Sequence, residues 1–81
     1  MNNESKVVGI DVSKARLDVA VVPEGESFSE ANEDSGIAAL VERLRRLRPD
    51  LVVMEATGGY ETSAAMAISA AGIRLAVLWW R

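Results

Sequence analysis

The first third of the chain shows the hydrophobic patterns of three β-strands. Residues 6–12 form a short, nearly continuous apolar run rich in β-branched side chains, which predicts an interior strand covered on both faces. Residues 16–22 alternate apolar and polar side chains, which predicts a second strand, antiparallel to the first, with an apolar face made of Leu17, Val19 and Val21. Residues 27–31 are mostly polar and predict a third strand at an edge of the sheet.

The period changes to that of a helix after residue 34. Apolar side chains then recur at helical spacing, at Ile37, Leu40, Val41, Leu44 and Leu47. Asp34 or Ser35 is placed to cap the first turn, arginines fill the last turn, and Pro49 ends the helix. The sequence therefore predicts one helix between the third strand and Pro49.

The remaining residues predict two strands and a second helix. Residues 50–55 are typical of a buried strand, residues 58–59 of a tight connection, residues 60–71 of an alanine-rich helix ended by Gly72, and residues 73–78 of a final strand. The order βββαβαβ joins a meander to two crossovers. It predicts an α/β fold in which helices pack on a mixed sheet.

Composition excludes several classes of chemistry. Residues 1–81 are few enough for one small domain at most, and they include neither Cys nor His. This excludes disulfides, zinc sites with thiolate or imidazole ligands, and Ser-His-Asp triads. The longest uncharged stretch, residues 62–73, has 12 residues, fewer than the roughly 20 that cross a bilayer, and residues 1–5 lack an apolar signal core. We therefore expect a cytoplasmic protein with no membrane partner.

Charge is divided unevenly along the chain, although the net charge is only −3. Residues 1–42 carry three basic and nine acidic side chains, whereas residues 43–81 carry six basic and three acidic ones. The basic side chains include four arginines of the predicted first helix, Arg43, Arg45, Arg46 and Arg48. They form either a solvated helix face, with Glu42 pairing with Arg46, or a contact for the backbone of a nucleic acid.

Two acidic residues directly follow the most apolar strands. Asp11 comes after Val-Val-Gly-Ile, and Glu55 comes after Leu-Val-Val-Met. Ligand sites form beyond the carboxyl ends of parallel strands, so these acids are placed to face one another. Carboxylates without His or Cys suit a hard cation, Mg²⁺ or Mn²⁺, and such sites handle phosphate groups. The structural alternatives are that Asp11 bonds to the backbone of Ser13 or Lys14, and that Glu55 pairs with Arg74.

Charge counting shows what this pair lacks. Two metal ions about 3.5 to 4 Å apart can activate a water and stabilise the leaving oxygen of a phosphodiester, but they bring four positive charges against two carboxylates. The nearby acids that could complete such a site are Asp18, Asp50 and Glu61. Asp18 is expected to point to the face opposite Leu17 and Val19.

The loop after Glu55 is a candidate for binding phosphate groups of a nucleic acid. Its residues are Thr57, Gly58 and Gly59. They lead into a helix N-terminus, which can hold an anion, although a plain turn is the alternative. Lys14 follows Asp11 closely enough to reach a substrate phosphate. Tyr60 is expected to pack in the core or at its rim rather than to stack on a base.

Four segments match a known family pattern. They are Val-Gly-Ile-Asp-Val-Ser-Lys (8–14), Leu-Asp-Val-Ala-Val (17–21), Gly-Ile-Ala-Ala-Leu (36–40) and Glu-Ala-Thr-Gly-Gly-Tyr-Glu (55–61). Together they resemble the N-terminal domain of DEDD-type insertion-sequence transposases. The resemblance extends over residues 6–77 and implies a RuvC-like, ribonuclease-H-like mixed sheet. It also implies that Asp11 and Glu55 are the first two of four metal-binding acids.

The resemblance implies an activity and its partners. Such transposases cleave and rejoin DNA strands of an insertion sequence, which implies Mg²⁺ or Mn²⁺, DNA, a structured guide RNA and a homo-oligomer. The family places its other two acids on a later helix, and its pattern continues past Val77, where this chain reads Leu-Trp-Trp-Arg (78–81) and stops. We therefore expect a truncated or frameshifted product, or a fragment, that lacks the later acid-bearing helix and cleaves no DNA by itself.

Two alternatives remain open. An actin-like or sugar-kinase-like nucleotide-binding lobe shares this topology and begins with a similar strand, but its phosphate-binding turn resembles Gly-Thr-Thr, where this chain has Val12, Ser13 and Lys14. The other alternative is a non-enzymatic remnant that co-assembles with a full-length transposase. Tight binding of Mg-ATP would favour the first alternative, and association with an intact relative would favour the second.

Overall fold

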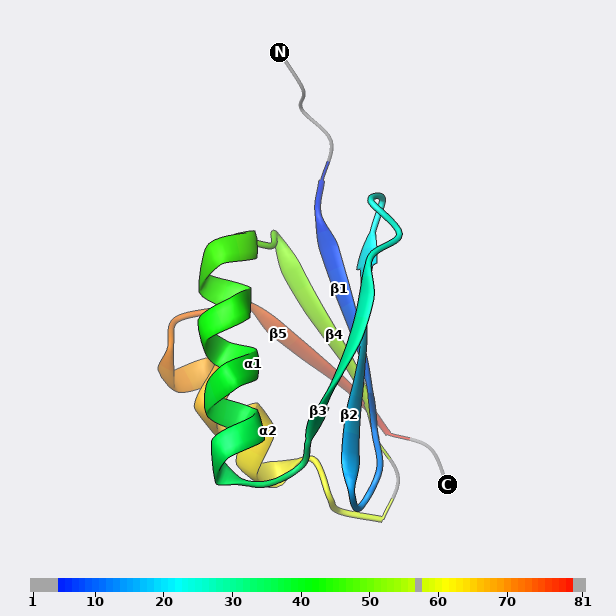
Figure 1. The fold of residues 1–81 in the computed structure, drawn as a ribbon, viewed down its shortest axis with the longest axis vertical. Helices are drawn as coiled ribbons and strands as arrows, with labels where there is room; N and C mark the ends of the chain where they lie inside the picture. The colour runs from blue at the N-terminus through cyan, green and yellow to red at the C-terminus, as the bar shows by residue number, and fades with distance from the viewer. Residues whose placement is uncertain (1–4, 57, 80–81) are drawn as a thin grey trace.

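Five strands and two helices make up the described part of the chain. The computed structural model describes residues 5–56 and 58–79. The elements are β1 (Val7–Val12), β2 (Arg16–Val22), β3 (Ser27–Ala31), α1 (Asp34–Leu47), β4 (Leu51–Ala56), α2 (Thr62–Ala70) and β5 (Leu75–Trp79). The strands form one sheet in the order β3-β2-β1-β4-β5 (Figure 1). β1 pairs antiparallel with β2 and parallel with β4, so the predicted mixed sheet and element order are confirmed.

Both helices lie on the same side of the sheet (Figure 1). That side carries the core, in which α1 buries Ile37, Leu40 and Leu44 and α2 buries Ala64 and Ile68. β1, β2 and β4 contribute every second residue to this core, because successive side chains of a strand point to opposite faces. The buried strand residues are Val8, Ile10, Val12, Leu17, Val19, Val21, Val52, Met54 and Ala56.

The opposite face of the sheet, here called the open face, is not covered by the described residues. The prediction that the first strand is covered on both faces is therefore wrong for this part of the chain. In β1, Gly9 is half-buried and Asp11 is exposed, whereas their neighbours are buried. β1 is interior only in the sense that strands flank it on both sides.

The helix ends differ slightly from the prediction. The N-cap of α1 is Glu33, and no side chain caps it, so neither Asp34 nor Ser35 has the expected capping role. α2 begins at Thr62 rather than at residue 60, after two glycines with positive φ at residues 58–59. Neither helix in the described ranges has the length and apolar character needed to cross a bilayer.

Candidate functional site

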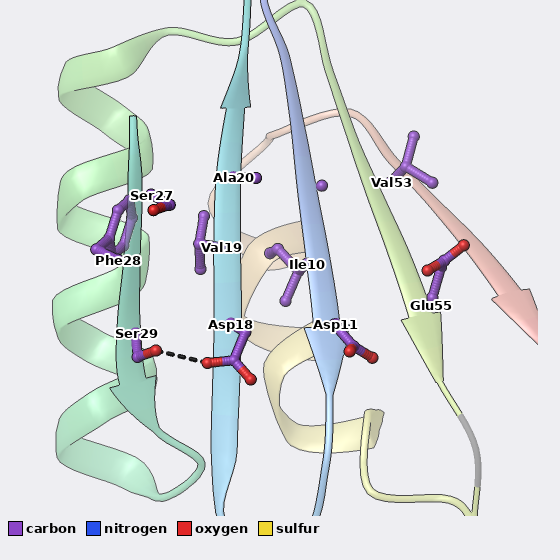
Figure 2. A pocket seen from close by; sticks show the side chains of 11 residues that line it. Ile10, Asp11, Asp18, Val19, Ala20, Ser27, Phe28, Ser29, Val53 and Glu55 are labelled. Carbon is purple, nitrogen blue, oxygen red and sulfur yellow. Dashed lines mark hydrogen bonds between the residues drawn. The ribbon is translucent and has the colours of Figure 1, made fainter. Parts of the chain in front are cut away.

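A row of polar residues crosses the open face of the sheet. Asp11 on β1 is the register partner of Glu55 on the parallel strand β4 and of Asp18 on the antiparallel strand β2, and Asp18 is in turn paired with Ser29 on β3. Register partners point to the same face, so all four side chains share the open face, where they are exposed (Figure 2). The structure thus places the two predicted site acids side by side on neighbouring strands.

This row borders a shallow concavity of about 620 Å³. It is lined by Gly9, Ile10, Asp11, Asp18, Val19, Ala20, Ser27, Phe28, Ser29, Val53 and Glu55. Gly9 and Ala20, whose side chains are absent or small, line the hollow. The three acids Asp11, Asp18 and Glu55 lie toward one end of it (Figure 2). The hollow is open to solvent, so a ligand of the acids can approach from the open face.

Asp18 belongs to a separate hydrogen-bonded group within the row. Its carboxylate accepts a hydrogen bond of 2.5 Å from the Ser29 hydroxyl and one of 3.0 Å from the Arg16 guanidinium. The hydrogen bond from Ser29 is the largest cause of a lowered pKa of Asp18, and the bond from Arg16 is the next. They hold one carboxylate oxygen toward β3, away from Asp11 (Figure 2). The prediction that Asp18 points away from Leu17 and Val19 is confirmed, because both of those residues are buried.

The other two acids considered for the site lie elsewhere. Asp50 precedes β4, at the end opposite Glu55, where it accepts a 2.7 Å hydrogen bond from the backbone of Lys6. Glu61 is the N-cap of α2 and is only 4% exposed; its Oε1 atom has no hydrogen-bond partner within the described residues. In these same residues, no three or more of His, Cys, Asp and Glu are grouped so that they could hold a metal ion. Asp11 and Glu55 therefore stand as a pair.

The structural alternatives for these two acids find no support in the described residues. The backbone N–H of Ser13 donates to the carbonyl oxygen of Arg16, at 2.9 Å, and not to Asp11. Arg74 forms no ion pair with Glu55 in residues 5–56 and 58–79. Both carboxylates remain exposed and accessible to a ligand.

The basic residues are divided between structural and exposed positions. Arg43 pairs with Glu26 and lies over the ring of Phe28, with 3.8 Å between the guanidinium carbon and the ring centroid, so it joins α1 to β3. The expected pair of Glu42 with Arg46 is absent from the ion pairs of the described ranges. Arg45 and Arg46 on α1 and Arg48 at its C-terminal end are exposed, but α1 lies on the other side of the sheet from the acids. The exposed basic side chains next to the acids in the chain are Lys14, in the turn after β1, and Arg16, which pairs with Asp18.

One asparagine connects the two loops that follow the candidate acids. The Nδ2 atom of Asn32 donates to the carbonyl oxygens of Ser13, at 2.9 Å, and of Tyr60, at 3.0 Å. Sequence reasoning missed Asn32, because nothing in the local pattern signals a contact across 28 residues. The exposed residues Gly58 and Gly59 lie in the second loop, and Thr57 falls outside the described residues.

Comparison with known proteins identifies both a family and a fold. The family model for DEDD transposases of the IS110 group, described as transposase, matches residues 8–79. RuvC of T. thermophilus in complex with Holliday junction substrate is 22% identical, with a TM-score of 0.66, and the match covers 94% of this chain and 65% of RuvC. Pelota of Archaeoglobus fulgidus is 12% identical, with a TM-score of 0.71, over 94% of this chain and 26% of Pelota.

A second T. thermophilus RuvC structure is 21% identical, with a TM-score of 0.55, over 91% of this chain and 61% of that one. The chain thus spans less than two thirds of the length of each of these structures. No curated protein matches the sequence. At these identities the structural similarity shows the fold alone, which is RuvC-like and of the ribonuclease H type.

Proposed function

Because the chain belongs to the DEDD transposase family, whose model matches residues 8–79, we propose that it forms part of a RuvC-like nuclease domain in which Asp11 and Glu55 bind a divalent metal ion. The proposed activity is metal-dependent cleavage and rejoining of the DNA strands of an insertion sequence. One observation carries the proposal: the two acids are register partners on parallel strands, and both are exposed on the open face. The family match favours this function over the nucleotide-binding lobe.

The donor chemistry of the pair fits Mg²⁺ or Mn²⁺. Both ions prefer oxygen ligands and keep several waters, which two exposed carboxylates allow. When bound, such an ion lowers the pKa of a bound water and stabilises charge at a phosphate. Asp11 and Glu55 would hold the ion, and Lys14 would contact a phosphate of the DNA. Two carboxylates leave a two-metal site with excess positive charge, so we expect further acids to come from outside residues 5–79.

The proposed partner is DNA. The support is the family membership together with a neighbour of the same fold, the RuvC described in complex with a Holliday junction. Lys14 and the loop at Gly58 and Gly59 are the proposed contacts, because they are exposed and adjoin the ends of β1 and β4. For an intact transposase of this family we also propose a guide RNA and a homo-oligomer, because the family resemblance implies both.

A metal titration tests the pair of acids. Mn²⁺ binding by the purified chain, followed by the electron paramagnetic resonance signal of free Mn²⁺, should be lost in Asp11→Asn and in Glu55→Gln. Asp18→Asn is the matched control, because Arg16 and Ser29 hold that carboxylate away from the pair. Equal Mn²⁺ binding by all four proteins would remove the basis of the proposal.

The same variants test for cleavage. We expect the 81-residue chain to leave supercoiled and branched DNA intact in Mg²⁺ or Mn²⁺, because a pair of acids offsets too little of the charge of two metal ions. Nicking that Asp11→Asn abolishes would show that the pair suffices.

A further inference from the structure

Tyr60 presents an aromatic ring to solvent in the loop that follows the candidate metal ligand Glu55. It is the single tyrosine of the sequence, and it is 46% exposed, so of the two expected positions, in the core or at its rim, the one in the core is wrong. An aromatic ring left half open has apolar surface available to a ligand. The ring follows Glu55 by five residues, in the loop between β4 and α2.

The loop holds this ring in a defined position. One edge of the ring lies over the α-carbon of Gly58: a Cβ atom placed there would be 3.2 Å from Cε2 and 3.4 Å from Cδ2 of Tyr60. Gly58 also has a φ of +76°, which side chains rarely adopt. The carbonyl oxygen of Tyr60 accepts the 3.0 Å hydrogen bond from Asn32. The ring is thus supported on one side and open on the other, and a ligand would pay little entropy to order it.

The surroundings of the ring suit a nucleotide better than a protein surface. Through Asn32, the loop of Tyr60 is tied to Ser13 in the turn that follows Asp11. The neighbouring residues Gly58, Gly59 and Lys14 are exposed and offer backbone groups and a positive charge. Protein interfaces have contiguous apolar cores, whereas single-stranded nucleic acids are bound by isolated aromatic rings next to basic side chains.

We propose that Tyr60 is a stacking platform for an unpaired base of a DNA strand, one phosphate of which lies at the divalent ion that Asp11 and Glu55 would hold. This inference rests on the proposed function, because it takes DNA as the partner and the metal ion of the acid pair as the place of a phosphate. It adds a contact with a base, whereas Lys14 would contact only a phosphate of the backbone. Stacking is tolerant of base identity, so the platform favours unpaired over paired nucleotides without specifying a sequence.

Binding of single-stranded oligonucleotides to the purified chain in the presence of Mg²⁺, measured by fluorescence anisotropy, tests the platform. Tyr60→Ala and Tyr60→Leu should each weaken binding about tenfold, as loss of one stacked base does, whereas Tyr60→Phe keeps the ring and should bind like the wild type. A series of oligonucleotides, each lacking the base at a different position, locates the stacked base. At one position the missing base should weaken binding to the wild type by a similar factor, whereas binding to Tyr60→Ala should not change at that position. Lys14→Ala, in contrast, should reduce the salt dependence of binding, which Tyr60→Ala leaves unchanged.

The outcomes separate the platform from the proposed function. If Tyr60→Ala binds like the wild type, or if Tyr60→Leu retains full affinity, Tyr60 is not a stacking platform, while DNA remains the partner. If the wild-type chain binds no oligonucleotide, both the platform and the DNA contact fail, although the Mn²⁺ titration can still support the metal pair. Circular dichroism of each variant confirms that the fold is unchanged, as expected for an exposed ring.

Discussion

Hydrogen bonds divide the polar row of the open face into two parts. Asp18 is engaged by Ser29 and Arg16, whereas Asp11, directly opposite it, is not. Two carboxylates opposite each other on paired strands repel, and the bonds to Asp18 relieve this repulsion by drawing its charge toward β3. Asp11 is then left next to Glu55, so the arrangement of the pair depends on residues outside it.

The pKa of Asp18 reports this division. Ser29→Ala removes the largest cause of the lowered pKa, so the pKa of Asp18 should rise toward its ordinary value of 3.8. A lowered pKa in the folded state stabilises the fold above the unfolded value and is lost as the pH falls through the folded one. The wild type should therefore lose this contribution below about pH 4, and the variant should have less to lose. Carbon-detected NMR titration of the Asp18 carboxyl measures the shift.

Ser27→Ala serves as the control for this titration. Ser27 lies two residues before Ser29 on β3 and pairs with Ala20, not with Asp18. Its removal should leave the Asp18 titration unchanged. An unchanged titration in Ser29→Ala as well would mean that Ser29 does not hold the carboxylate.

The sequence could predict single site residues only where a local pattern marked them. Asp11 and Glu55 each end an apolar run, and this placed them at the carboxyl ends of strands. Asp18 lies opposite Asp11 because of the register between β1 and β2, and the hydrophobic pattern of a single strand does not predict that register. The two bonds of Asn32 depend on contacts between distant loops, and the exposure of Tyr60 depends on the path of its own loop, so neither was predictable.

At the scale of elements, the packing of α1 on β3 depends on one glycine. A Cβ atom at Gly36 would lie 1.9 Å from the carbonyl oxygen of Ala31 and 2.8 Å from its carbonyl carbon. The obstacle is backbone, which cannot rotate away as a side chain does. The glycine that opens the segment at 36–40 therefore has a structural role: it lets the first turn of α1 approach the end of β3.

Gly36→Ala should therefore destabilise the fold strongly. The two elements must separate to admit the methyl group, and overpacking of this kind costs about 3 kcal/mol. A small domain has little stability to lose, so the variant should be largely unfolded in urea concentrations that leave the wild type folded. Urea denaturation followed by circular dichroism measures the difference in unfolding free energy.

Gly9→Ala is the matched control. Nothing lies within 4 Å of a Cβ atom at Gly9, and its backbone does not have positive φ. In a strand, alanine loses less entropy on folding than glycine by about 0.5 to 1 kcal/mol, so this variant should be as stable as the wild type or slightly more stable. Equal stability of the two variants would contradict the close approach of α1 to β3.

The elements themselves were predictable because their hydrophobic periods differ. Alternation in residues 16–22 and helical spacing from residue 37 gave the strand and the helix directly. The ends were less predictable, since they depend on turns: α2 begins two residues late because the chain must first leave the positive-φ conformation at residues 58–59. Arg43 shows the same limit, because its pair with Glu26 requires α1 to lie next to the turn that precedes β3.

At the scale of the whole molecule, one face of the sheet packs against the helices in the core and the other carries the candidate site. The sequence alone could not show which face of the sheet is buried and which is open. A strand covered on both faces and a strand with small residues on one face both have a continuous apolar sequence. Both helices pack on the same face, and this leaves Gly9, Ala20 and Val53 to line the hollow of the open face. The loops at the carboxyl ends of β1 and β4 then meet at Asn32, which joins segments far apart in the chain.

Asn32→Asp tests whether this one side chain holds both loops. Aspartate has the same shape, but it loses both donor bonds and places a negative carboxylate against the carbonyl oxygens of Ser13 and Tyr60. Both bonds are exposed, so water can replace the lost donor, and each bond contributes about 1 kcal/mol. Hydrogen exchange should therefore become faster in both loops together, while the strands β1 and β4 keep their protection.

Ser35→Asp is the control: it adds the same charge at an exposed position near the start of α1 and should leave hydrogen exchange in both loops unchanged. Faster exchange in only one loop, or in neither, would show that Asn32 does not couple the two sides of the site.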